Sequence, residues 1–437
     1  MTRLAAPAVA LAVLVACMIA PVRQTSGDAA AGRLGALVLR CGGGFDLAHY
    51  DLVKFEVDHG RTPYYVHADE RGELTSVFGP APAVVGLLGV ADVGTGDRVD
   101  DHALRVRARA VAAALVALAA ALLVIAAAAR VPWRRAALAG LVAGGSFAGA
   151  ATLGQDLWQA TVALPPLVGA LAAFAWRARH PRANLATPAL LVLAVMIRPT
   201  IAPLALALGI GWAIDARGWK TWAIAVALAA VAAAPLVAWN IAHLWSPLPI
   251  GQWRANQSMT EDVIAPSRFF VALAGLVVSP ARGLVWFAPV ALVGAWAGAR
   301  GDRDQRIVAL AIAAQVACMA LFYKWHGGVA FGPRLVAEAV WLACWLVVDP
   351  KLPRALVAIA AAVTIAIGLL GLFRYDPDRW ETRRGPDGHP GALWDVADSP
   401  LTALVVDRSG AHSDDSPLTR GFVCERGGIR ALTAFDH

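Results

Sequence analysis

Long apolar runs return along almost the whole chain, separated by short polar turns. Many of them approach the roughly 20 residues with which a helix crosses the hydrocarbon core of a bilayer. Hydrophobic residues make up 58% of the 437 residues and charged residues only 16%, a balance that soluble globular domains do not show. We therefore expect an all-α, polytopic membrane protein with about eleven transmembrane helices. The expected spans are 4–20, 110–129, 136–153, 157–176, 185–197, 201–214, 222–239, 284–299, 307–322, 335–348 and 356–373.

Every second connection between these runs is basic, which predicts the orientation of the chain. Short cytoplasmic loops of membrane proteins collect Lys and Arg. We therefore expect a multi-pass protein of the cell membrane, with its N-terminus in the cytoplasm and its C-terminus outside. Arg105, Arg107 and Arg109 lie at the outer mouth of the second span, where they are either a functional rim or a helix end. The five basic turns contain Arg130, Arg134 and Arg135; Arg177, Arg179 and Arg182; Arg217 and Lys220; Arg300, Arg303 and Arg306; and Lys351 and Arg354.

Two long polar stretches remain outside the spans and define the expected organisation. Residues 1–373 are predicted to form one transmembrane unit, whose first extracytoplasmic loop, 21–108, carries amphipathic surface helices. Residues 374–437 are predicted to form an extracytoplasmic tail. The net charge of +7 comes mostly from the basic turns, so no nucleic-acid partner is expected.

The five cysteines show no metal-binding spacing and no CxxC pair. Only Cys41 and Cys424 fall in segments assigned to the outside, where disulfides persist. We expect them to form a disulfide that ties the first loop to the tail, with two free thiols as the alternative.

The segment from Tyr323 to Arg334, the 323–334 loop, places cations, aromatics and glycines between two apolar runs. Lys324, His326 and Arg334 suit an anionic headgroup, and the glycines let the backbone approach a ligand closely. The alternative is a basic, aromatic interfacial turn of the kind that any polytopic protein has. Other polar outliers lie on the same predicted side: Asp28, Asp46, Tyr50, Asp156, Arg198 and Arg282.

Several of these elements together resemble bacterial membrane glycosyltransferases of the GT-C superfamily, which includes protein mannosyltransferases and lipid A aminoarabinose transferases. The most specific element is Trp-x-Gly-Gly-x-x-Phe-Gly-Pro-Arg at 325–334, and Ser-Pro-x-Arg-Gly-Leu stands at 279–284. The first loop adds an acid after the first span (Asp28), Asp-Leu-x-x-Tyr at 46–50 and Pro-Tyr-Tyr at 63–65. In many relatives a second acid follows the first one, whereas here Ala29 follows Asp28.

The resemblance implies transfer of a sugar from a polyprenyl-phosphate donor to an extracytoplasmic glycan, lipid or protein acceptor, and we expect inversion at the sugar. Asp28 is then the expected catalytic base. Arginines aimed at the departing phosphate stabilise the transition state. The expected phosphate-binding residues are Arg334, Arg282, Arg198, Lys324 and His326, and the expected acceptor- or sugar-binding residues are Asp46, Tyr50, Asp156 and Trp325.

Other interpretations remain open at this point. A transporter or flippase of a lipid-linked intermediate would use the same cations to bind a headgroup, and Ala29 leaves an inactive scaffold of the same fold as a third alternative. Asp28 is alternatively a helix cap, Arg198 a snorkelling side chain near a turn, and Asp46 part of a solvated helix strip. The cofactor is unknown, since the sequence neither requires a divalent metal nor identifies ligands for one.

Overall fold

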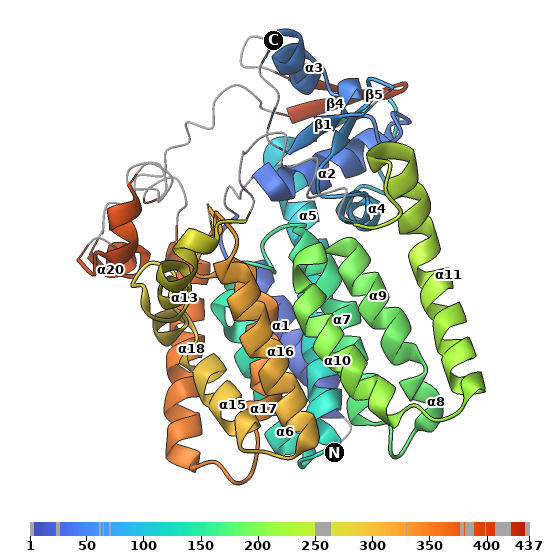
Figure 1. The fold of residues 1–437 in the computed structure, drawn as a ribbon. Helices are drawn as coiled ribbons and strands as arrows, with labels where there is room; N and C mark the ends of the chain where they lie inside the picture. Colours follow the sequence, from blue (N-terminus) through green and yellow to red (C-terminus); the bar gives the residue numbers. More distant parts are fainter. Residues whose placement is uncertain are drawn as a thin grey trace.

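The computed structural model describes residues 4–22, 27–60, 63, 65–69, 71–249, 264–328, 330–375, 380, 389–397, 399–406 and 421–432. Helices dominate these residues, as expected, and each of the predicted spans contains one (Figure 1). These helices are α1 (Ala5–Ile19), α5 (Asp101–Ala128), α6 (Trp133–Gly145), α7 (Gln159–Ala175), α9 (Ala186–Ile197), α10 (Ala202–Asp215), α11 (Trp219–Leu244), α15 (Pro289–Ala299), α16 (Arg303–Ala320), α17 (Ala337–Val347) and α18 (Arg354–Arg374).

Within the described residues, three helices are long and apolar enough to cross a membrane: α5, α11 and α18. Several others are too short, because an α-helix of 11 residues rises only about 16 Å. Their runs are interrupted: α6 passes into a π-helical turn at Phe147–Ala151 (η4), and Arg198 with Pro199 separates α9 from α10. The structure therefore supports a protein with membrane-capable helices, while eleven spans remain a prediction.

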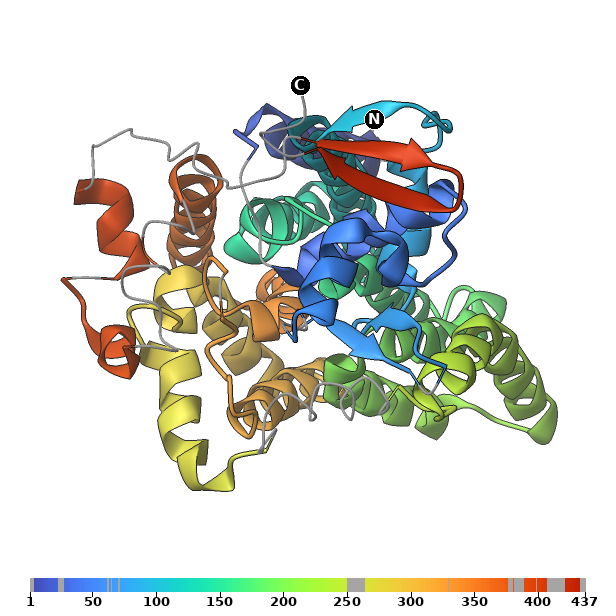
Figure 2. The same cartoon turned by 90° about the horizontal axis from the view of Figure 1, so that it is seen from above.

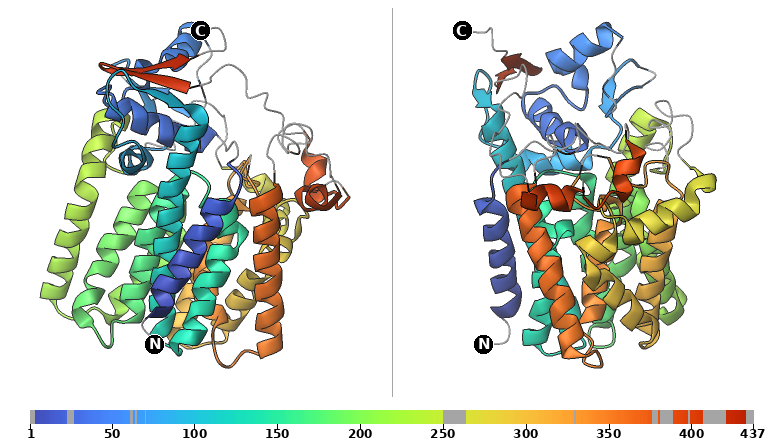
Figure 3. Two further views of the ribbon diagram at one scale, coloured as in Figure 1. Left: turned by 180° about the vertical axis from the view of Figure 1, so that it is seen from behind. Right: turned by 90° about the vertical axis from the view of Figure 1, so that its left-hand side faces the viewer.

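The helices pack through small residues. α5 packs against α1, α6 and α7, and α1 runs beside α5 in Figure 3. Every residue of α17 is buried, and Gly294 of α15 faces the backbone of Ala343 in α17. Gly144 of α6 lies against the side chain of Val13 in α1. Glycine at such positions lets two helix backbones approach closely, which is how helices associate where no water is displaced.

The five basic turns meet at one end of the molecule, which we call the basic end. Arg177 pairs with Asp215 and with Asp304, each at 2.8 Å, and Arg303 also pairs with Asp215 at 2.8 Å. The prediction that these turns share one side of the protein thus agrees with their contacts. Further contacts join Arg130 to Asp302, Arg135 to the carbonyl of Asp349, and Gln305 to the carboxylate of Asp349.

The opposite end carries a cap of short helices and strands (Figures 1 and 2). α5 leads from the cap to the basic end, since it starts directly after β3 and ends just before Arg130. We use the word cap for residues 27–100 and 421–432. It contains α2 (Gly27–Arg40), α3 (Asp51–Asp58), α4 (Ala81–Gly86), β1 (Val66–Ala68), β2 (Leu74–Ser76), β3 (Arg98–Asp100), β4 (Gly421–Glu425), β5 (Gly428–Leu432) and the 3₁₀ turns η2 (Leu47–His49) and η3 (Leu87–Gly89).

The strands were not predicted, and one of the two sheets joins residues 98–100 to the described end of the tail. β1 and β2 form an antiparallel hairpin, and β3, β4 and β5 form an antiparallel sheet in that order. Arg98 lies opposite Val423, so the described end of the tail is part of the cap. Of the predicted surface helices, α3 buries only Val53, whereas α2 buries most of its residues and packs against α4.

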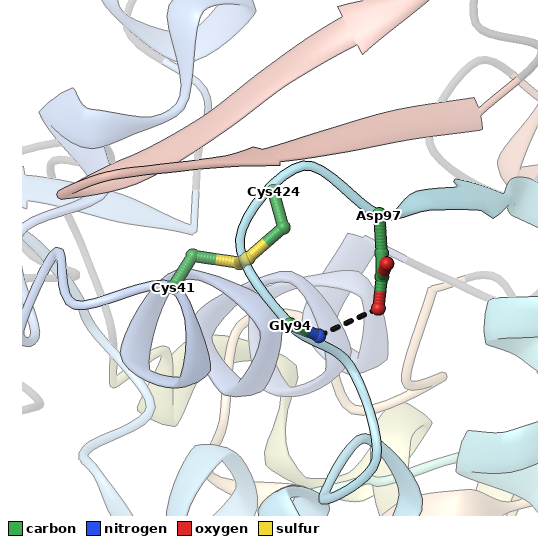
Figure 4. Close-up of a disulfide and its surroundings, with 4 residues drawn as sticks. All are labelled: Cys41, Gly94, Asp97 and Cys424. Carbon is green, nitrogen blue, oxygen red and sulfur yellow. Dashed lines mark hydrogen bonds between the residues drawn. A yellow bond between two sulfur atoms is a disulfide. The ribbon is translucent and has the colours of Figure 1, made fainter.

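A disulfide fixes this arrangement. Cys41 follows α2 and Cys424 lies in β4, and their sulfurs are bonded with Cα atoms 5.5 Å apart (Figure 4). The backbone N–H of Cys424 donates to the carbonyl of Asp97, whose carboxylate accepts from Gly94. The bond expected from the sequence is present, and it closes the cap over the start of α5.

Arg105, Arg107 and Arg109 at the start of α5 have contacts typical of a helix end. They contact Asp101, Asp92 and the carbonyls at the end of α1, respectively.

The remaining described elements are short. They are α8 (Pro181–Asn184), α13 (Phe269–Val278), α14 (Leu284–Phe287), α20 (Pro400–Val406), η5 (Pro199–Ile201), η6 (Pro266–Arg268), η7 (Arg334–Val336) and η8 (Pro390–Trp394).

Candidate functional site

The 323–334 loop requires its glycines. Gly327, Gly328 and Gly332 have φ values of 79°, 61° and 76°, in the left-handed region that favours glycine. A Cβ at Gly332 would lie 2.8 Å from Phe147 and 2.9 Å from Phe287, and one at Gly327 would lie 2.9 Å from Cγ of Arg334. The loop therefore turns tightly against buried rings and folds back on its own arginine.

Arg282 holds this loop in place. Its side chain is fully buried. Its Nε donates to the carbonyl of His326 and its Nη2 to the carbonyl of Gly328, both at 2.9 Å, and its guanidinium lies 5.3 Å from the ring of Trp380. The two sequence elements 279–284 and 325–334 thus meet. In this structure Arg282 positions the loop backbone, and the phosphate contact expected for it remains a prediction.

Arg334 contacts Asp28, which lies in a distant part of the sequence. Its Nη1 lies 2.7 Å from Oδ2 of Asp28, and its guanidinium covers the ring of Trp158 at 4.8 Å. The two charged side chains are 16% and 19% exposed, so a ligand can reach them. Nε of Arg334 is buried and has no hydrogen-bond partner among the described residues. This donor is suited to an oxygen-rich anion.

Helix α2 supplies both the acid and a second arginine. Asp28 lies in the first turn of α2, where the helix N-terminus favours a negative charge. One turn further, Arg33 pairs with Asp156 at 2.5 Å, and both side chains are buried. Asp156 directly precedes Leu157, and its Oδ1 accepts a hydrogen bond from the backbone N–H of Leu157 at 2.8 Å. Asp156 thus anchors the segment that carries Trp158.

The segment before α7 and the 323–334 loop are also joined directly. The hydroxyl of Thr152 donates to the carbonyl of Phe331 at 3.1 Å. The amide of Gln159 donates to the carbonyl of Phe78 in the cap. Three separate parts of the chain therefore surround the Asp28–Arg334 pair: α2 with the cap, the segment 152–159, and the 323–334 loop.

Arg198 forms an ion pair with Glu338 that the sequence analysis did not predict. Nε of Arg198 lies 2.8 Å from Oε1 of Glu338, whose side chain is completely buried. Glu338 lies in the first turn of α17, just after Arg334. A lone acid in an apolar run is itself a signal for a functional or paired residue. That signal was present and would have identified Glu338.

The other cations and the tryptophan of the loop lie close by but have different surroundings. Nζ of Lys324 lies 5.7 Å from the ring of Tyr323, and the side chain is half-buried. His326 is buried and its Nδ1 accepts from the N–H of Gly328 at 3.3 Å. Trp325 is buried against Gly275 of α13.

The contacts described for Asp46 and Tyr50 hold the cap together. Oδ1 of Asp46 accepts from the N–H groups of Ala48 and Leu74, at 2.8 and 2.9 Å. The ring of Tyr50 is buried edge-on against Phe422, 5.8 Å between centroids. The structure does not place these two among the contacts described for the Asp28–Arg334 pair.

The Pro-Tyr-Tyr element is described only in part, because Tyr64 lies outside the described residues. Burial raises the pKa of Tyr65 to about 12, so its hydroxyl remains protonated at neutral pH. Tyr65 is therefore a neutral hydrogen-bonding group of the cap.

Sequence reasoning missed Arg33 and the role of Trp158 because neither has a local signal. Arg33 reads as part of an amphipathic helix, and Trp158 reads as one of many interfacial tryptophans. Only the fold brings them to Asp156 and Arg334.

A separate group of metal-ligating side chains, Asp69, Glu73 and His243, connects the β1–β2 hairpin to α11.

Comparison with known proteins adds no assignment to this geometry. No family model matches the chain, and no curated protein is significantly similar to it in sequence. The candidate site therefore rests on the residues themselves. It is an accessible Asp28–Arg334 pair, with the Arg334 guanidinium over the ring of Trp158, between the cap and the 323–334 loop.

Proposed function

We propose that this protein is a glycosyltransferase of the GT-C type, which moves a sugar from a polyprenyl-phosphate donor to an extracytoplasmic acceptor. The observation that carries the proposal is the contact between Asp28 and Arg334 at 2.7 Å. A carboxylate for proton removal and an arginine for the phosphate are the two groups that this reaction needs, and the fold brings them together from distant parts of the sequence.

The proposal places the molecule in the cell membrane with the cap outside. The basic end then faces the cytoplasm, in keeping with the distribution of Lys and Arg. Among the described residues, α5, α11 and α18 are long and apolar enough to cross the membrane, and eleven spans are part of the proposal. The Asp28–Arg334 pair lies where the first helix reaches the cap, so it meets the outer leaflet, in which a polyprenyl carrier would lie.

Donor binding would change the partner of Arg334. A phosphodiester offers oxygens that match the planar guanidinium, whose Nε has no hydrogen-bond partner in the described part of the chain. When Arg334 turns to the phosphate, its ion pair with Asp28 weakens, and the carboxylate of Asp28 becomes a stronger base. The ion pair thus keeps Asp28 a weaker base until the donor has bound.

The reaction follows from these positions. The acceptor hydroxyl transfers its proton to the Asp28 carboxylate while its oxygen attacks C1 of the sugar. The bond between C1 and the phosphate oxygen breaks, and its electron pair leaves with the polyprenyl phosphate. The charge that develops on this phosphate is stabilised by Arg334 more than the charge of the bound donor is. Attack from the face opposite the leaving group inverts the configuration at C1.

Other residues of the site position this pair. Arg282 fixes the backbone of the 323–334 loop, and the Arg33–Asp156 pair fixes α2 against the segment that carries Trp158. The Arg198–Glu338 pair connects the end of α9 to the first turn of α17, which follows Arg334 in the sequence. Lys324 is the remaining half-buried loop cation and would add positive charge near the phosphate.

The test is turnover by purified protein in lipid vesicles with a panel of polyprenyl-phosphate sugars, measured as release of polyprenyl phosphate. We expect release with one sugar class and an acceptor-dependent rate. Donor binding without release, for every donor and for a mixture of envelope acceptors, would overturn the proposal and favour a lipid carrier or an inactive scaffold.

A further inference from the structure

We infer that Asp69, Glu73 and His243 form a binding site for one divalent transition-metal ion, of which Zn²⁺ is the best match, and that the bound ion ties the cap to α11. The nitrogen and carboxylate oxygens of these three residues lie within 4.8 Å of one another. The site does not depend on the proposed transfer reaction and is distinct from the Asp28–Arg334 pair.

The distances fit a metal better than they fit direct hydrogen bonds. Nδ1 of His243 lies 3.4 Å from Oδ2 of Asp69 and 3.5 Å from Oε2 of Glu73. A charge-assisted N–H···O bond is normally about 2.7–2.9 Å long, so both separations are too long for strong direct bonds. Two ligands of a tetrahedral zinc ion, each bound at about 2.0–2.1 Å, lie about 3.3 Å apart, close to both observed values.

The β1–β2 hairpin orients its two carboxylates for this purpose. Oδ1 of Asp69 accepts from the N–H groups of Arg71 and Glu73, at 2.8 and 2.9 Å. These bonds fix the side chain and direct the other oxygen, Oδ2, toward His243. The Asp69 carboxylate is completely buried. A buried carboxylate whose second oxygen faces an imidazole at ligand spacing is the arrangement expected of a metal ligand with a fixed orientation.

Histidine comes from a different element and lies in apolar surroundings. His243 is in the last turn of α11, 174 residues from Asp69 in sequence. Its ring packs against Trp239, 4.9 Å between centroids, and against Phe45 of the cap at 6.4 Å. This shell lowers the local dielectric constant and strengthens the attraction between a cation and the two carboxylates.

The ligand set selects the class of metal. One imidazole nitrogen with two carboxylates suits Zn²⁺ and its neighbours in the first transition series, whereas Mg²⁺ and Ca²⁺ prefer all-oxygen sites. Two carboxylates and a neutral imidazole carry a charge of −2, which one divalent ion neutralises. Three protein ligands leave a fourth position for water.

A metal here would solve a structural problem of α11. This helix packs along α9, and little of its apolar surface is buried in the molecule. Its outer end is therefore held mainly by what the cap offers. An ion shared between the hairpin and His243 would fix that end by bonds that neither lipid nor water can replace.

The experiment is zinc titration of the full-length protein, purified without a polyhistidine tag and treated with chelator, by calorimetry and by metal analysis after dialysis. We expect one Zn²⁺ per chain, a higher melting temperature with zinc, and no comparable response to Mg²⁺. Glu73→Gln and His243→Ala should each weaken zinc binding at least tenfold and abolish the rise in melting temperature.

The matched control is His49→Ala. His49 is an exposed histidine of the cap, and its Nε2 lies 3.9 Å from Oδ2 of Asp46. This variant should bind zinc like the wild type. The side chain of Glu73 is 39% exposed, so Glu73→Gln is expected to fold and keeps the test decisive even if His243→Ala does not fold. Absence of stoichiometric zinc in the wild type, or zinc binding that survives Glu73→Gln unchanged, overturns the inference.

Discussion

The two ends of the molecule both hold arginines against carboxylates, but with different numbers of partners. At the basic end, Arg177 contacts two carboxylates, those of Asp215 and Asp304. At the cap end, Arg334 contacts Asp28 and the face of Trp158, and within the described residues its Nε has no hydrogen-bond partner. An arginine shared by two acids is already neutralised. One that holds a single acid and an aromatic face retains capacity for an anion.

Under the proposed function and orientation the two ends have different tasks: charge at the basic end determines topology, and charge at the cap end serves the reaction. The ion pairs of the basic end connect neighbouring basic turns to one another. Around the cap end, by contrast, Arg282 uses its donors on backbone carbonyls, which leaves Arg334 as the accessible arginine of the 323–334 loop. From the sequence, Arg282 and Arg334 were both expected to bind the phosphate, and nothing in the sequence showed that their contacts would differ.

The largest effect concerns orientation, which decides whether the comparison holds at all. Reporters that are active only in the cytoplasm should be active when fused after Arg135, Arg182, Lys220, Arg306 or Arg354, and inactive after Gly328. A reporter that is active only outside should show the reverse pattern. Because a fusion lies on one side or the other, the result is all-or-none. An external signal after Arg182 or Arg306 would contradict the orientation and with it an outward-facing site.

Asp28→Asn tests the cap end directly. The amide preserves the size of the side chain and its place in the first turn of α2, but it cannot accept a proton. We expect turnover to fall about a hundredfold or more while donor binding is retained. The measurement is single-turnover release of polyprenyl phosphate, together with donor binding at equilibrium.

The matched control is Asp100→Asn, the same change at a cap aspartate that accepts from the N–H of Ala103 at 3.0 Å. Asparagine caps a helix as well as aspartate does, so this variant should turn over like the wild type. Unchanged turnover in Asp28→Asn would remove the acid from the mechanism and shift attention to Asp46 or Asp51.

Arg334 is expected to give the next largest effect. Arg334→Ala removes a charge-assisted contact worth about 1.5–3 kcal/mol, which corresponds to a loss of roughly ten- to a hundredfold in turnover. Arg334→Lys keeps the charge without the planar fork and should retain more activity than the alanine variant. Arg107→Ala is the control, since Arg107 pairs with Asp92 at the same end but outside the site. Wild-type turnover by Arg334→Ala would leave the loop as an interfacial turn.

Helix positions and the Cys41–Cys424 disulfide could be predicted from the sequence because the prediction depends on local composition. Apolar runs identify the helices, and the alternation of basic turns groups Cys41 with Cys424. The same reasoning overestimated the length of several helices. Polar or helix-breaking residues such as Arg198 and Pro199 end them early, and composition averaged over a window does not register a single break.

The site could be predicted only in part, because its pairs join residues that are far apart in sequence. Asp28 and Arg334 were each identified, but nothing in their local sequence showed that they touch. The pairs Arg33–Asp156 and Arg198–Glu338 became visible only in the folded structure. The three-stranded sheet was missed for the same reason, since β3 and β4 lie far apart in the sequence and each is too short to show an alternating pattern.

The smallest predicted effect is at the basic end. Burial raises the pKa of Asp302, but hydrogen bonds from Arg130 and from the backbone of Gln305 outweigh it and hold the pKa below its ordinary value. A lowered pKa in the folded state stabilises the protein above the unfolded-state value of about 3.9. That stability is lost as the pH falls through the folded pKa.

Asp302→Asn keeps the helix cap of α16 but removes the ion pair with Arg130. Because the Asp302 side chain is 54% exposed, solvent screens the pair, and we expect the variant to lose at most about 1 kcal/mol at pH 7. Thermal unfolding in lipid at a series of pH values measures this. The difference from the wild type should shrink as the pH falls below about 4 and disappear below the lowered pKa that Asp302 has in the folded protein. Turnover at pH 7 should be unchanged, and a tenfold loss would show that charge at the basic end also serves the reaction.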